Sequence, residues 1–292
     1  MTRTGRFAPS PTGHLHLGNL RTALLAWLFA RSQGAGFRVR MEDLDSSRVR
    51  PGLADQQLAD LAALGLDWDG EVVVQSGRTA AYEAALAVLE RAGRLYPCFC
   101  TRAEIRAAVS APHSPAEEGA YPGTCRDLSA SERATRIAAG RHPALRVRAE
   151  GDPIVFEDRL RGRVEGRVDD FVVRRNDGAF AYNLAVVVDD AAQGIGEVVR
   201  GDDLLSSTGR QLKLAALLGV AAPAHAHVPL VLGPDGSRLA KRHGSVTLRE
   251  LEPGRALAWM CRSLGLPAAR RPLELVDAFD VRALPTAPSV YP

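Results

Sequence analysis

Residues 9–19 read Pro-Ser-Pro-Thr-Gly-His-Leu-His-Leu-Gly-Asn and connect a short predicted strand to an apolar predicted helix from about Leu20 to Ala30. In a doubly wound α/β sheet, the turn between the first strand and the first helix is a ligand-binding position. The helix N-terminus offers unpaired backbone N–H groups to phosphate, and Gly13 and Gly18 let a nucleotide approach the backbone. We therefore expect a nucleotide site here, with a turn whose histidines are satisfied locally as the structural alternative.

Strands and helices alternate on both sides of a long irregular segment. Before it, the predicted elements are a strand at FRVRM (37–41), a helix at 51–65, a strand at EVVV (71–74) and a helix at 77–93. After it, they are AYNLAVVVDD (181–190), GEVVRG (196–201), a long helix at 203–219 and a strand at VPLVL (228–232). Strands that alternate with helices form parallel sheets. The predicted fold class is thus α/β, with a Rossmann-type parallel sheet.

The irregular segment spans residues 98–175. Its arginine-rich stretches ALRVRA, RGRVEGRV and DFVVRR have the character of short strands, and we interpret the segment as an insertion that divides the Rossmann domain. The predicted domains are residues 1–97 and 176–250 for the two halves of the catalytic domain, 98–175 for the insertion and 251–292 for a short helical C-terminus with a proline-rich tail. We expect partial disorder in this tail because little periodicity follows Pro272.

The length and the composition limit the possible classes of protein. With 292 residues, the chain can form one large α/β domain with a small inserted subdomain, but not two domains of equal size. The N-terminal residues lack the apolar core of a signal peptide, and no run approaches the ~20 apolar residues of a membrane span. We therefore expect a cytoplasmic protein with no membrane partner. The net charge of +3 neither requires nor excludes a nucleic-acid partner.

A second candidate site is the cationic loop Arg238-Leu239-Ala240-Lys241-Arg242-His243-Gly244-Ser245, which follows a GPDG turn. Of the 37 basic residues only Lys213 and Lys241 are lysine, so a lysine kept in this loop is a candidate for a specific role. An ammonium group that meets developing negative charge on phosphate stabilises a transition state. A solvated basic loop is the alternative. The chain has no GxxxxGK[ST] loop, and no G-x-G-x-x-G opens its first helix, so another mode of nucleotide binding is needed.

Three of the four cysteines, Cys98, Cys100 and Cys125, lie in the insertion. Three thiolates and a fourth ligand satisfy tetrahedral Zn²⁺, and a loop-rich segment with little core gains most from a bound metal. The C-x-C spacing is tighter than the usual C-x-x-C, so the pattern by itself is only moderately specific. We expect one structural Zn²⁺ per chain in an inserted zinc-binding subdomain. We expect Cys261, in an apolar predicted helix, to be a core residue.

The two candidate sites together resemble the paired signatures of class I aminoacyl-tRNA synthetases. His16-Leu17-Gly18-Asn19 is similar to the HIGH-type motif of that class, and Arg238–Arg242 to its KMSKS-type motif. Further motifs resemble the glutamyl branch, namely Arg6-Phe7-Ala8-Pro9-Ser10-Pro11-Thr12-Gly13, Met41-Glu42-Asp43-Leu44-Asp45, Tyr182-Asn183, Val187-Val188-Asp189-Asp190 and Arg200-Gly201-Asp202-Asp203. The resemblance covers residues 5 to about 250.

This resemblance implies a glutamate site whose side chains match the two carboxylates and the one ammonium of the substrate. Arg6 and Arg200 suit the carboxylates and Glu42 suits the ammonium. Tyr182 can orient the substrate through a hydrogen bond. The full set that the resemblance implies is Arg6, Phe7, Ala8, Pro9, Ser10, Glu42, Tyr182 and Arg200. For each charged residue taken alone, a structural ion pair is the alternative.

The resemblance also implies that the substrate carboxylate attacks the α-phosphorus of ATP, while the enzyme contributes positioning and charge stabilisation. His16 and Lys241 are the implied catalytic residues, and Mg²⁺ accompanies ATP. The implied ATP-binding residues are Thr12, Gly13, His14, His16, Gly18, Asn19 and Lys241. At the metal site, the resemblance implies Tyr121 as the fourth ligand beside Cys98, Cys100 and Cys125, with Asp127 and His113 as alternatives.

Only about 50 residues follow Arg242, where full-length glutamyl-tRNA synthetases carry a helical anticodon-binding region. The chain therefore resembles a short branch of the family, which activates L-glutamate to glutamyl-adenylate without tRNA and attaches it to queuosine in the anticodon loop of tRNA(Asp). We expect ATP, L-glutamate and queuosine-containing tRNA(Asp) as partners of a monomeric ligase. The alternatives are a shortened glutamyl-tRNA synthetase that charges tRNA(Glu) and a non-catalytic nucleotide- or RNA-binding paralogue.

Arginines of the insertion could follow the phosphates of an RNA loop. They are Arg146, Arg148, Arg159, Arg161, Arg163, Arg167, Arg174 and Arg175. Because arginine is the generic cation of this chain, a solvated face is the alternative for any one of them.

Overall fold

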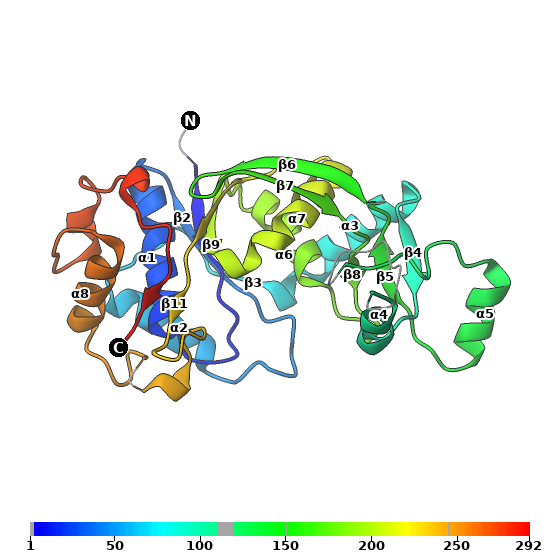
Figure 1. Ribbon diagram of the computed structural model, residues 1–292, viewed down its shortest axis with the longest axis horizontal. Coiled ribbons are helices and arrows are strands. Elements are labelled where there is room, and N and C mark those ends of the chain that lie inside the picture. The colour runs from blue at the N-terminus through cyan, green and yellow to red at the C-terminus, as the bar shows by residue number, and fades with distance from the viewer. Residues whose placement is uncertain (1–2, 110–119, 150, 245) are drawn as a thin grey trace.

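The computed structural model describes residues 3–109, 120–149, 151–244 and 246–292. A parallel sheet forms its centre (Figure 1). The strands of this sheet are β1 (Gly5–Phe7), β2 (Phe37–Met41), β3 (Val73–Val74), β9 (Glu197–Gly201) and β10 (Ala224–Val228). They pair in parallel in the orders β1-β2-β3 and β9-β10. The Gly196 N–H donates to the Thr4 carbonyl oxygen over 2.9 Å, which joins the two groups of strands. The predicted parallel α/β sheet is thus confirmed.

Helices pack around this sheet. They are α1 (Leu17–Arg31), α2 (Leu53–Ala63), α3 (Thr79–Arg91), α6 (Tyr182–Ala192), α7 (Leu205–Leu218) and α8 (Pro253–Leu264), with the 3₁₀ turns η1 (Gln75–Arg78), η2 (Asp202–Leu204) and η3 (Lys241–His243). Among the described residues, no helix is both long enough and apolar enough to span a bilayer.

The start of α1 fixes the position of the turn at residues 9–16. The Asn19 N–H donates to His16 Nδ1 over 3.3 Å, and the His16 N–H donates to Asn19 Oδ1 over 3.2 Å, so the two residues form a capping box. The helix consequently begins at Leu17, three residues before the predicted start. Because β1 ends at Phe7, the turn lies at the carboxyl end of a parallel strand, where such sheets bind ligands.

Part of the insertion forms a second, antiparallel sheet at the opposite end of the molecule from α8 (Figure 1). Its strands are β4 (Leu95–Cys98), β5 (Ala144–Val147) and β8 (Val172–Arg174), paired in the order β4-β5-β8. The short helices α4 (Arg102–Val109) and α5 (Ala130–Ala138) complete this module.

The remaining part of the insertion belongs to the central sheet. Strands β6 (Asp152–Asp158) and β7 (Gly162–Val168) form a hairpin, and β6 pairs with β10 in parallel at Asp158 and His225. The interpretation of residues 98–175 as one separate insertion therefore needs a correction. The hairpin resembles a surface segment in the sequence because its side chains alternate between half-buried and exposed positions along most of β6.

The predicted strand at VPLVL (228–232) is also displaced in the structure. The central strand β10 ends at Val228, and only the two-residue strand β11 (Val231–Leu232) follows. The β10 sequence AHAHV places His225 and His227 in buried positions. Polar residues at inward positions hide the apolar alternation by which a strand is usually predicted.

The proline-rich tail is packed rather than disordered, which corrects the expectation for residues after Pro272. It contains η4 (Pro272–Leu275), η5 (Val281–Ala283) and β12 (Ser289–Val290), and β12 pairs with β11 in parallel. Leu275 and Leu284 are buried in the main core, and the rings of Tyr291 and Trp259 meet edge to face with centroids 5.3 Å apart. A few apolar contacts at irregular spacing hold this segment, so periodicity does not reveal them.

Candidate active site

A cavity of about 590 Å³ lies at the carboxyl ends of the central strands. Its lining includes every residue predicted for glutamate, namely Arg6, Phe7, Ala8, Pro9, Ser10, Glu42, Tyr182 and Arg200. It also includes Thr12, Gly13, His14, His16, Gly18 and Asn19 from the set predicted for ATP. The fold thus brings together residues that are almost 200 positions apart in the chain.

Lys241 is the one predicted ATP residue whose side chain lies outside the described part of the structure. Its backbone belongs to η3, in the loop that follows β11. Arg238 of the same loop lines the cavity and pairs with Asp203, with 2.7 Å between Arg238 Nη1 and Asp203 Oδ2. The loop therefore lies beside the cavity, on the side of the turn at residues 9–16.

Buried charges surround the end of the cavity that contains Arg6, Glu42 and Arg200. Arg40 Nη1 donates to Asp190 Oδ1 over 2.8 Å, Arg40 Nη2 donates to Glu42 Oε1 over 3.1 Å, and Arg6 Nε lies 3.5 Å from Asp190 Oδ1. Burial alone raises the pKa of Asp190, but the charges of Arg40 and Arg6 outweigh it and lower that pKa. Burial raises the pKa of Glu42, and the charges of Arg40 and Arg6 offset this effect of burial only in part. Glu42 thus lies where a further positive charge stabilises it.

Arg200 is held from behind by short hydrogen bonds. It donates to Thr208 Oγ1 over 2.7 Å, to Gln211 Oε1 over 2.8 Å and to His227 Nε2 over 3.1 Å. Its two longer bonds, of 3.3 Å each, reach the Tyr182 hydroxyl and the Leu204 carbonyl oxygen, and both of these residues line the cavity. A substrate carboxylate can replace the two long bonds without disturbing the short ones.

His16 presents one N–H group at the other end of the cavity. Burial, followed by the charge of Arg238, lowers its pKa to about 4, so the imidazole is neutral at neutral pH. Its Nδ1 accepts the Asn19 N–H, which leaves the proton on Nε2. A Cβ on Gly18 would lie 3.0 Å from His16 Cε1, so only glycine leaves the ring unhindered. The arrangement suits a donor to a phosphate oxygen beside the N-terminus of α1.

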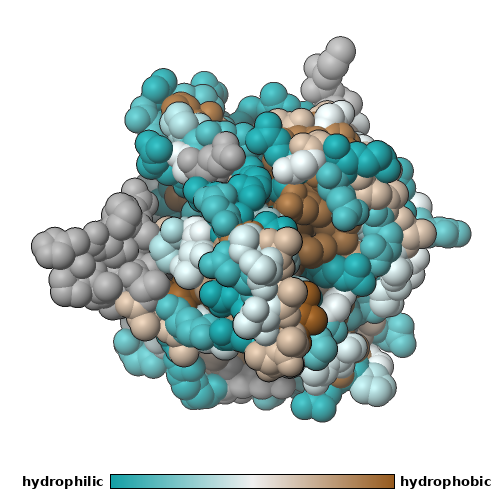
Figure 2. Space-filling view, turned by 90° about the vertical axis from the view of Figure 1, so that its right-hand side faces the viewer, coloured by the Kyte–Doolittle hydropathy of each residue, from teal (hydrophilic) through white to brown (hydrophobic). Residues whose placement is uncertain are grey.

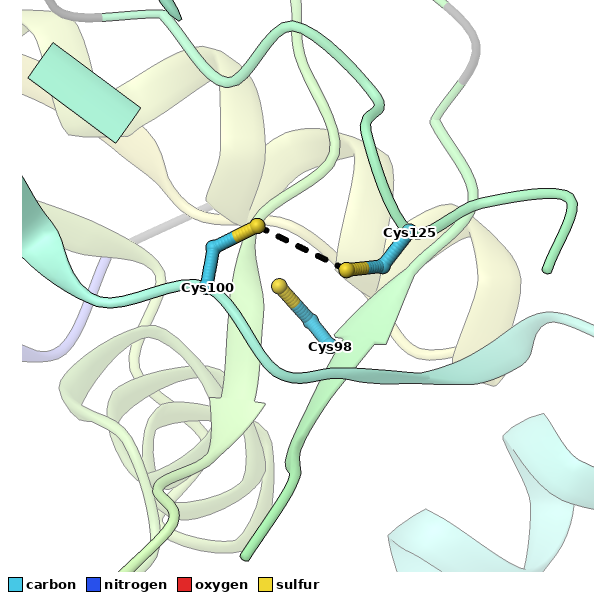
Figure 3. A group of neighbouring side chains, drawn as sticks. All are labelled: Cys98, Cys100 and Cys125. Atoms are coloured by element: carbon cyan, nitrogen blue, oxygen red, sulfur yellow. Dashed lines mark hydrogen bonds between the residues drawn. The ribbon is translucent and has the colours of Figure 1, made fainter. Parts of the chain in front are cut away.

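The three cysteines of the insertion converge on one point (Figure 3). Their Sγ atoms lie within 4.8 Å of one another, and those of Cys100 and Cys125 are 3.5 Å apart. The Tyr121 hydroxyl lies 3.3 Å from Cys98 Sγ and 3.9 Å from Cys100 Sγ. Burial raises the pKa of Cys100 to about 12, and the hydrogen bond with Cys125 and the charge of Cys98 add to this. The cluster can hold a metal ion.

The alternative fourth ligands are placed differently. Asp127 has an 82% exposed side chain that pairs with Arg148 over 3.3 Å, and it is not part of the cluster. His113 lies outside the described residues. Tyr121 is thus the alternative that the structure places beside the three sulfurs.

The arginines of the insertion have local partners. Arg146 is buried, with its guanidinium 3.7 Å from the centre of the Tyr121 ring and a hydrogen bond to the Asp170 carbonyl oxygen, and it lines a second cavity, so its contact with RNA stays a prediction. Among the described residues, six of the other seven form ion pairs, all except Arg167, and these pairs are Arg148–Asp127, Arg159–Glu197, Arg161–Asp202, Arg163–Glu165, Arg174–Glu83 and Arg175–Asp177. Figure 2 shows that this end of the molecule is largely hydrophilic, with apolar areas between polar ones.

The sequence-based reasoning missed the residues behind the cavity, among them Arg40, Asp158, Thr208, Gln211 and His227. They form no contiguous motif. The signal that could have revealed them is the presence of charged or strongly polar residues within otherwise apolar strands and helices, since such residues need buried partners.

Residues 2–261 match the family model of class I tRNA synthetases (E and Q), catalytic domain. The chain belongs to this family. It is 61% identical to a glutamyl-Q tRNA(Asp) synthetase of Nocardia farcinica, over 97% of this chain and 91% of that protein. It is 49% identical to a protein of the same name from Symbiobacterium thermophilum, over 99% and 95% of the two chains. The class I synthetase resemblance and the expectation of a ligase are thereby confirmed, and within the family the chain groups with the relatives of that name.

A solved structure shares the fold. The crystal structure of a glutamate tRNA ligase from Elizabethkingia meningosepticum, in complex with its amino acid, superposes with a TM-score of 0.84 at 26% identity. The match covers all of this chain and 67% of that one. The whole chain therefore shares its fold with about two thirds of that ligase.

Proposed function

We propose that this class I synthetase activates L-glutamate with ATP to glutamyl-adenylate and transfers the glutamyl group to queuosine in the anticodon loop of tRNA(Asp). The observation that carries the proposal is the cavity in which Arg6, Arg200 and Glu42 lie at one end and the N-terminus of α1 lies at the other. The acceptor is proposed from the relatives named glutamyl-Q tRNA(Asp) synthetase, which match nearly full length.

Glutamate fits the charge distribution of the cavity. One carboxylate replaces the long hydrogen bonds of Arg200, and Arg6 is available to the other. The ammonium pairs with Glu42, whose raised pKa reflects incomplete compensation by Arg40 and Arg6. Phe7, Ala8, Pro9 and Ser10 form the wall between these groups.

ATP then occupies the region of Thr12, Gly13, His14, Gly18 and Asn19. Its phosphates meet the His16 Nε2–H and the N-terminus of α1, and we assign to Lys241, whose backbone lies in η3, the stabilisation of their developing charge. Bound Mg²⁺ would supply charge neutralisation on the phosphates. The carboxylate of glutamate attacks the α-phosphorus and pyrophosphate leaves, with no protein nucleophile.

A second cavity supports transfer to a large acceptor. It has a volume of about 1110 Å³ and shares Ser10, Glu42 and Tyr182 with the first cavity. Its other wall comes from the insertion, including Arg102 and Arg141. We place the acceptor nucleotide in this second cavity, from which it reaches the glutamyl carbonyl past Tyr182.

The acceptor is tested by incubating the enzyme and ATP with labelled glutamate and, in parallel, queuosine-containing tRNA(Asp), unmodified tRNA(Asp) and tRNA(Glu). Label confined to the modified tRNA(Asp), and retained after oxidation of the 3′ end, is expected. Label on tRNA(Glu) would favour a shortened glutamyl-tRNA synthetase. A failure to form glutamyl-adenylate would favour a non-catalytic paralogue.

For the cysteine cluster we propose one structural Zn²⁺ bound by Cys98, Cys100, Cys125 and Tyr121. Three sulfurs and one oxygen at a common point form a donor set for tetrahedral zinc. Metal analysis of the purified protein should give one zinc per chain in the wild type and loss of zinc in Cys100→Ser. Asp127→Asn is the control and should retain zinc, because Asp127 points to Arg148. A folded wild-type protein without zinc would refute the proposal.

A further inference from the structure

A buried chain of hydrogen bonds runs from the β6–β7 hairpin of the insertion to Arg200. Asp158, at the end of β6, accepts His227 Nδ1 over 2.6 Å, and His227 Nε2 lies 3.1 Å from Arg200 Nε. The side chains of Asp158 and His227 are fully buried. The three residues come from three adjacent strands, since β6 pairs with β10 and β10 pairs with β9.

We propose that Asp158 and His227 are positioning residues for glutamate recognition, which set the orientation of the Arg200 guanidinium through the tautomer of the His227 ring. This inference rests on the proposed role of Arg200 in binding a substrate carboxylate. It assigns to the hairpin a role in amino-acid recognition, in addition to any contact of the insertion with RNA.

The chemistry of both neighbours determines the position of the imidazole proton. An arginine Nε–H can only donate, so His227 Nε2 must carry a lone pair. An ionised aspartate can only accept, so His227 Nδ1 must carry the proton. The two requirements agree on one neutral tautomer, with the proton on Nδ1.

The environment of Asp158 keeps it ionised. Its side chain also accepts the backbone N–H groups of Leu160, Arg161 and His227. Burial opposes ionisation, but these bonds together with that from the His227 ring outweigh burial and lower the pKa of Asp158 to about 2. Burial lowers the pKa of His227 despite the nearby carboxylate, which is consistent with a neutral ring.

The orientation of Arg200 depends on this acceptor. The His227 ring fixes the Nε side of the guanidinium, while Thr208 and Gln211 fix one N–H on each of its other nitrogens. The remaining two N–H groups then point to the cavity side, where Tyr182 and Leu204 lie. If Nε2 carried the proton, it would face the Arg200 Nε–H and could donate only to Thr208 Oγ1, which lies 3.1 Å away and already accepts from Arg200. Arg200 would then lose the acceptor of its Nε–H and compete with the ring for Thr208.

Asp158→Asn tests the inference with little change in volume. The amide can donate to His227 Nδ1 and so select the opposite tautomer. In glutamate-dependent pyrophosphate exchange, we expect the KM for glutamate to rise about tenfold or more, as for the loss of a hydrogen bond to a charged group. The KM for ATP should remain unchanged. Glu197→Gln is the matched control, because it neutralises a buried carboxylate at the start of β9, where its partners are Arg3, Arg159 and Gln33.

A second measurement reads the tautomer directly. In ¹⁵N-histidine NMR of the wild-type enzyme, we expect the proton of His227 on Nδ1, with the signal identified by its loss in His227→Gln. A proton on Nε2 in the wild type would overturn the inference even if Asp158→Asn does not fold. So would an unchanged KM for glutamate in a folded Asp158→Asn variant. Absence of glutamate-dependent exchange in the wild type is a different result, because it removes the proposed function on which the inference rests.

Discussion

Buried charges around the cavity are paired residue by residue, and two adjacent aspartates of α6 share Arg40 but differ in their other partners. Asp189 accepts hydrogen bonds from Gln75, Arg78 and the Tyr82 hydroxyl, and so ties α6 to η1 and α3. Asp190 pairs with Arg6 and Arg40 next to the cavity, and Arg40 Nε also lies 3.9 Å from Asp189 Oδ2. An unpaired buried charge costs several kcal/mol. Asp190 therefore holds Arg6 beside the cavity before any substrate binds.

Replacement of Lys241 by alanine should lower the rate of adenylate formation by about 10²-fold or more, with glutamate affinity nearly unchanged. The reason is that an ammonium in the loop after β11 acts on charge that develops on the phosphates during the reaction. Steady-state and single-turnover kinetics provide the measurement. Lys213→Ala is the control. Lys213 is the only other lysine of the chain; it lies in α7 and pairs with Asp152 at the start of β6. Equal rates for Lys241→Ala and the wild type would instead support the alternative interpretation, in which the loop is a solvated basic surface.

His225 should make the stability of the enzyme depend on pH. Burial, followed by the charge of Arg200, lowers its pKa from 6.5 to about 3. Unfolding therefore takes up a proton between these values, and stability falls as the pH falls through this window. Urea unfolding at several pH values between about 3 and 6.5 gives the free energy of unfolding as a function of pH. This free energy should rise with pH more steeply in the wild type than in His225→Gln, by up to about 1.4 kcal/mol per pH unit. Parallel slopes for the two proteins would contradict the assignment of a buried neutral imidazole.

At the scale of elements, α1 connects the cavity to the C-terminal tail. Arg21 is almost fully buried on α1 and donates to the Pro229 carbonyl oxygen over 2.9 Å, to Ser263 Oγ over 3.0 Å and to Ser289 Oγ over 3.3 Å. These three partners lie just before β11, at the end of α8 and in β12. One side chain thus holds the tail against the helix that carries His16.

Arg21→Met should destabilise the fold by at least about 2 kcal/mol, since it removes several bonds from a charged donor and leaves buried acceptors without it. Urea unfolding provides the measurement. Arg31→Met, near the end of the same helix, is the control. Arg31 pairs with Asp67 and Asp69 at a more exposed position, and its loss should cost about 1 kcal/mol or less. Equal losses in the two variants would show that Arg21 does not clamp the tail.

At the scale of the whole molecule, the sequence is most informative where chemistry and local structure coincide. The turn at residues 9–19 combines a strand end, glycines and a helix start, so a ligand-binding turn could be predicted from it, and it does line the cavity. The parallel sheet could be predicted from the alternation of strands and helices, and the other lining residues only from the resemblance to class I synthetases. Asp158 and His227 could not be predicted, because their roles arise from the pairing of strands that lie about 70 residues apart. The packing of the tail after Pro272 likewise depends on contacts with α1 and β11. Such long-range contacts cannot be predicted from the local periodicity of the sequence.

The assembled state of the cavity leads to a prediction about the whole enzyme, namely that glutamate-dependent pyrophosphate exchange proceeds without RNA. Arg200 is held by Thr208, Gln211 and His227, and Arg6 lies beside Asp190, so protein contacts alone orient the groups that meet the substrate. Exchange should be measured with nuclease-treated enzyme, ATP, Mg²⁺ and glutamate, with and without tRNA(Asp) or tRNA(Glu). Arg200→Ala is the negative control, because exchange that survives it does not come from this cavity. Exchange that appears only after tRNA is added would mean that RNA contacts complete the site, and a preformed cavity would then be the wrong description of this enzyme.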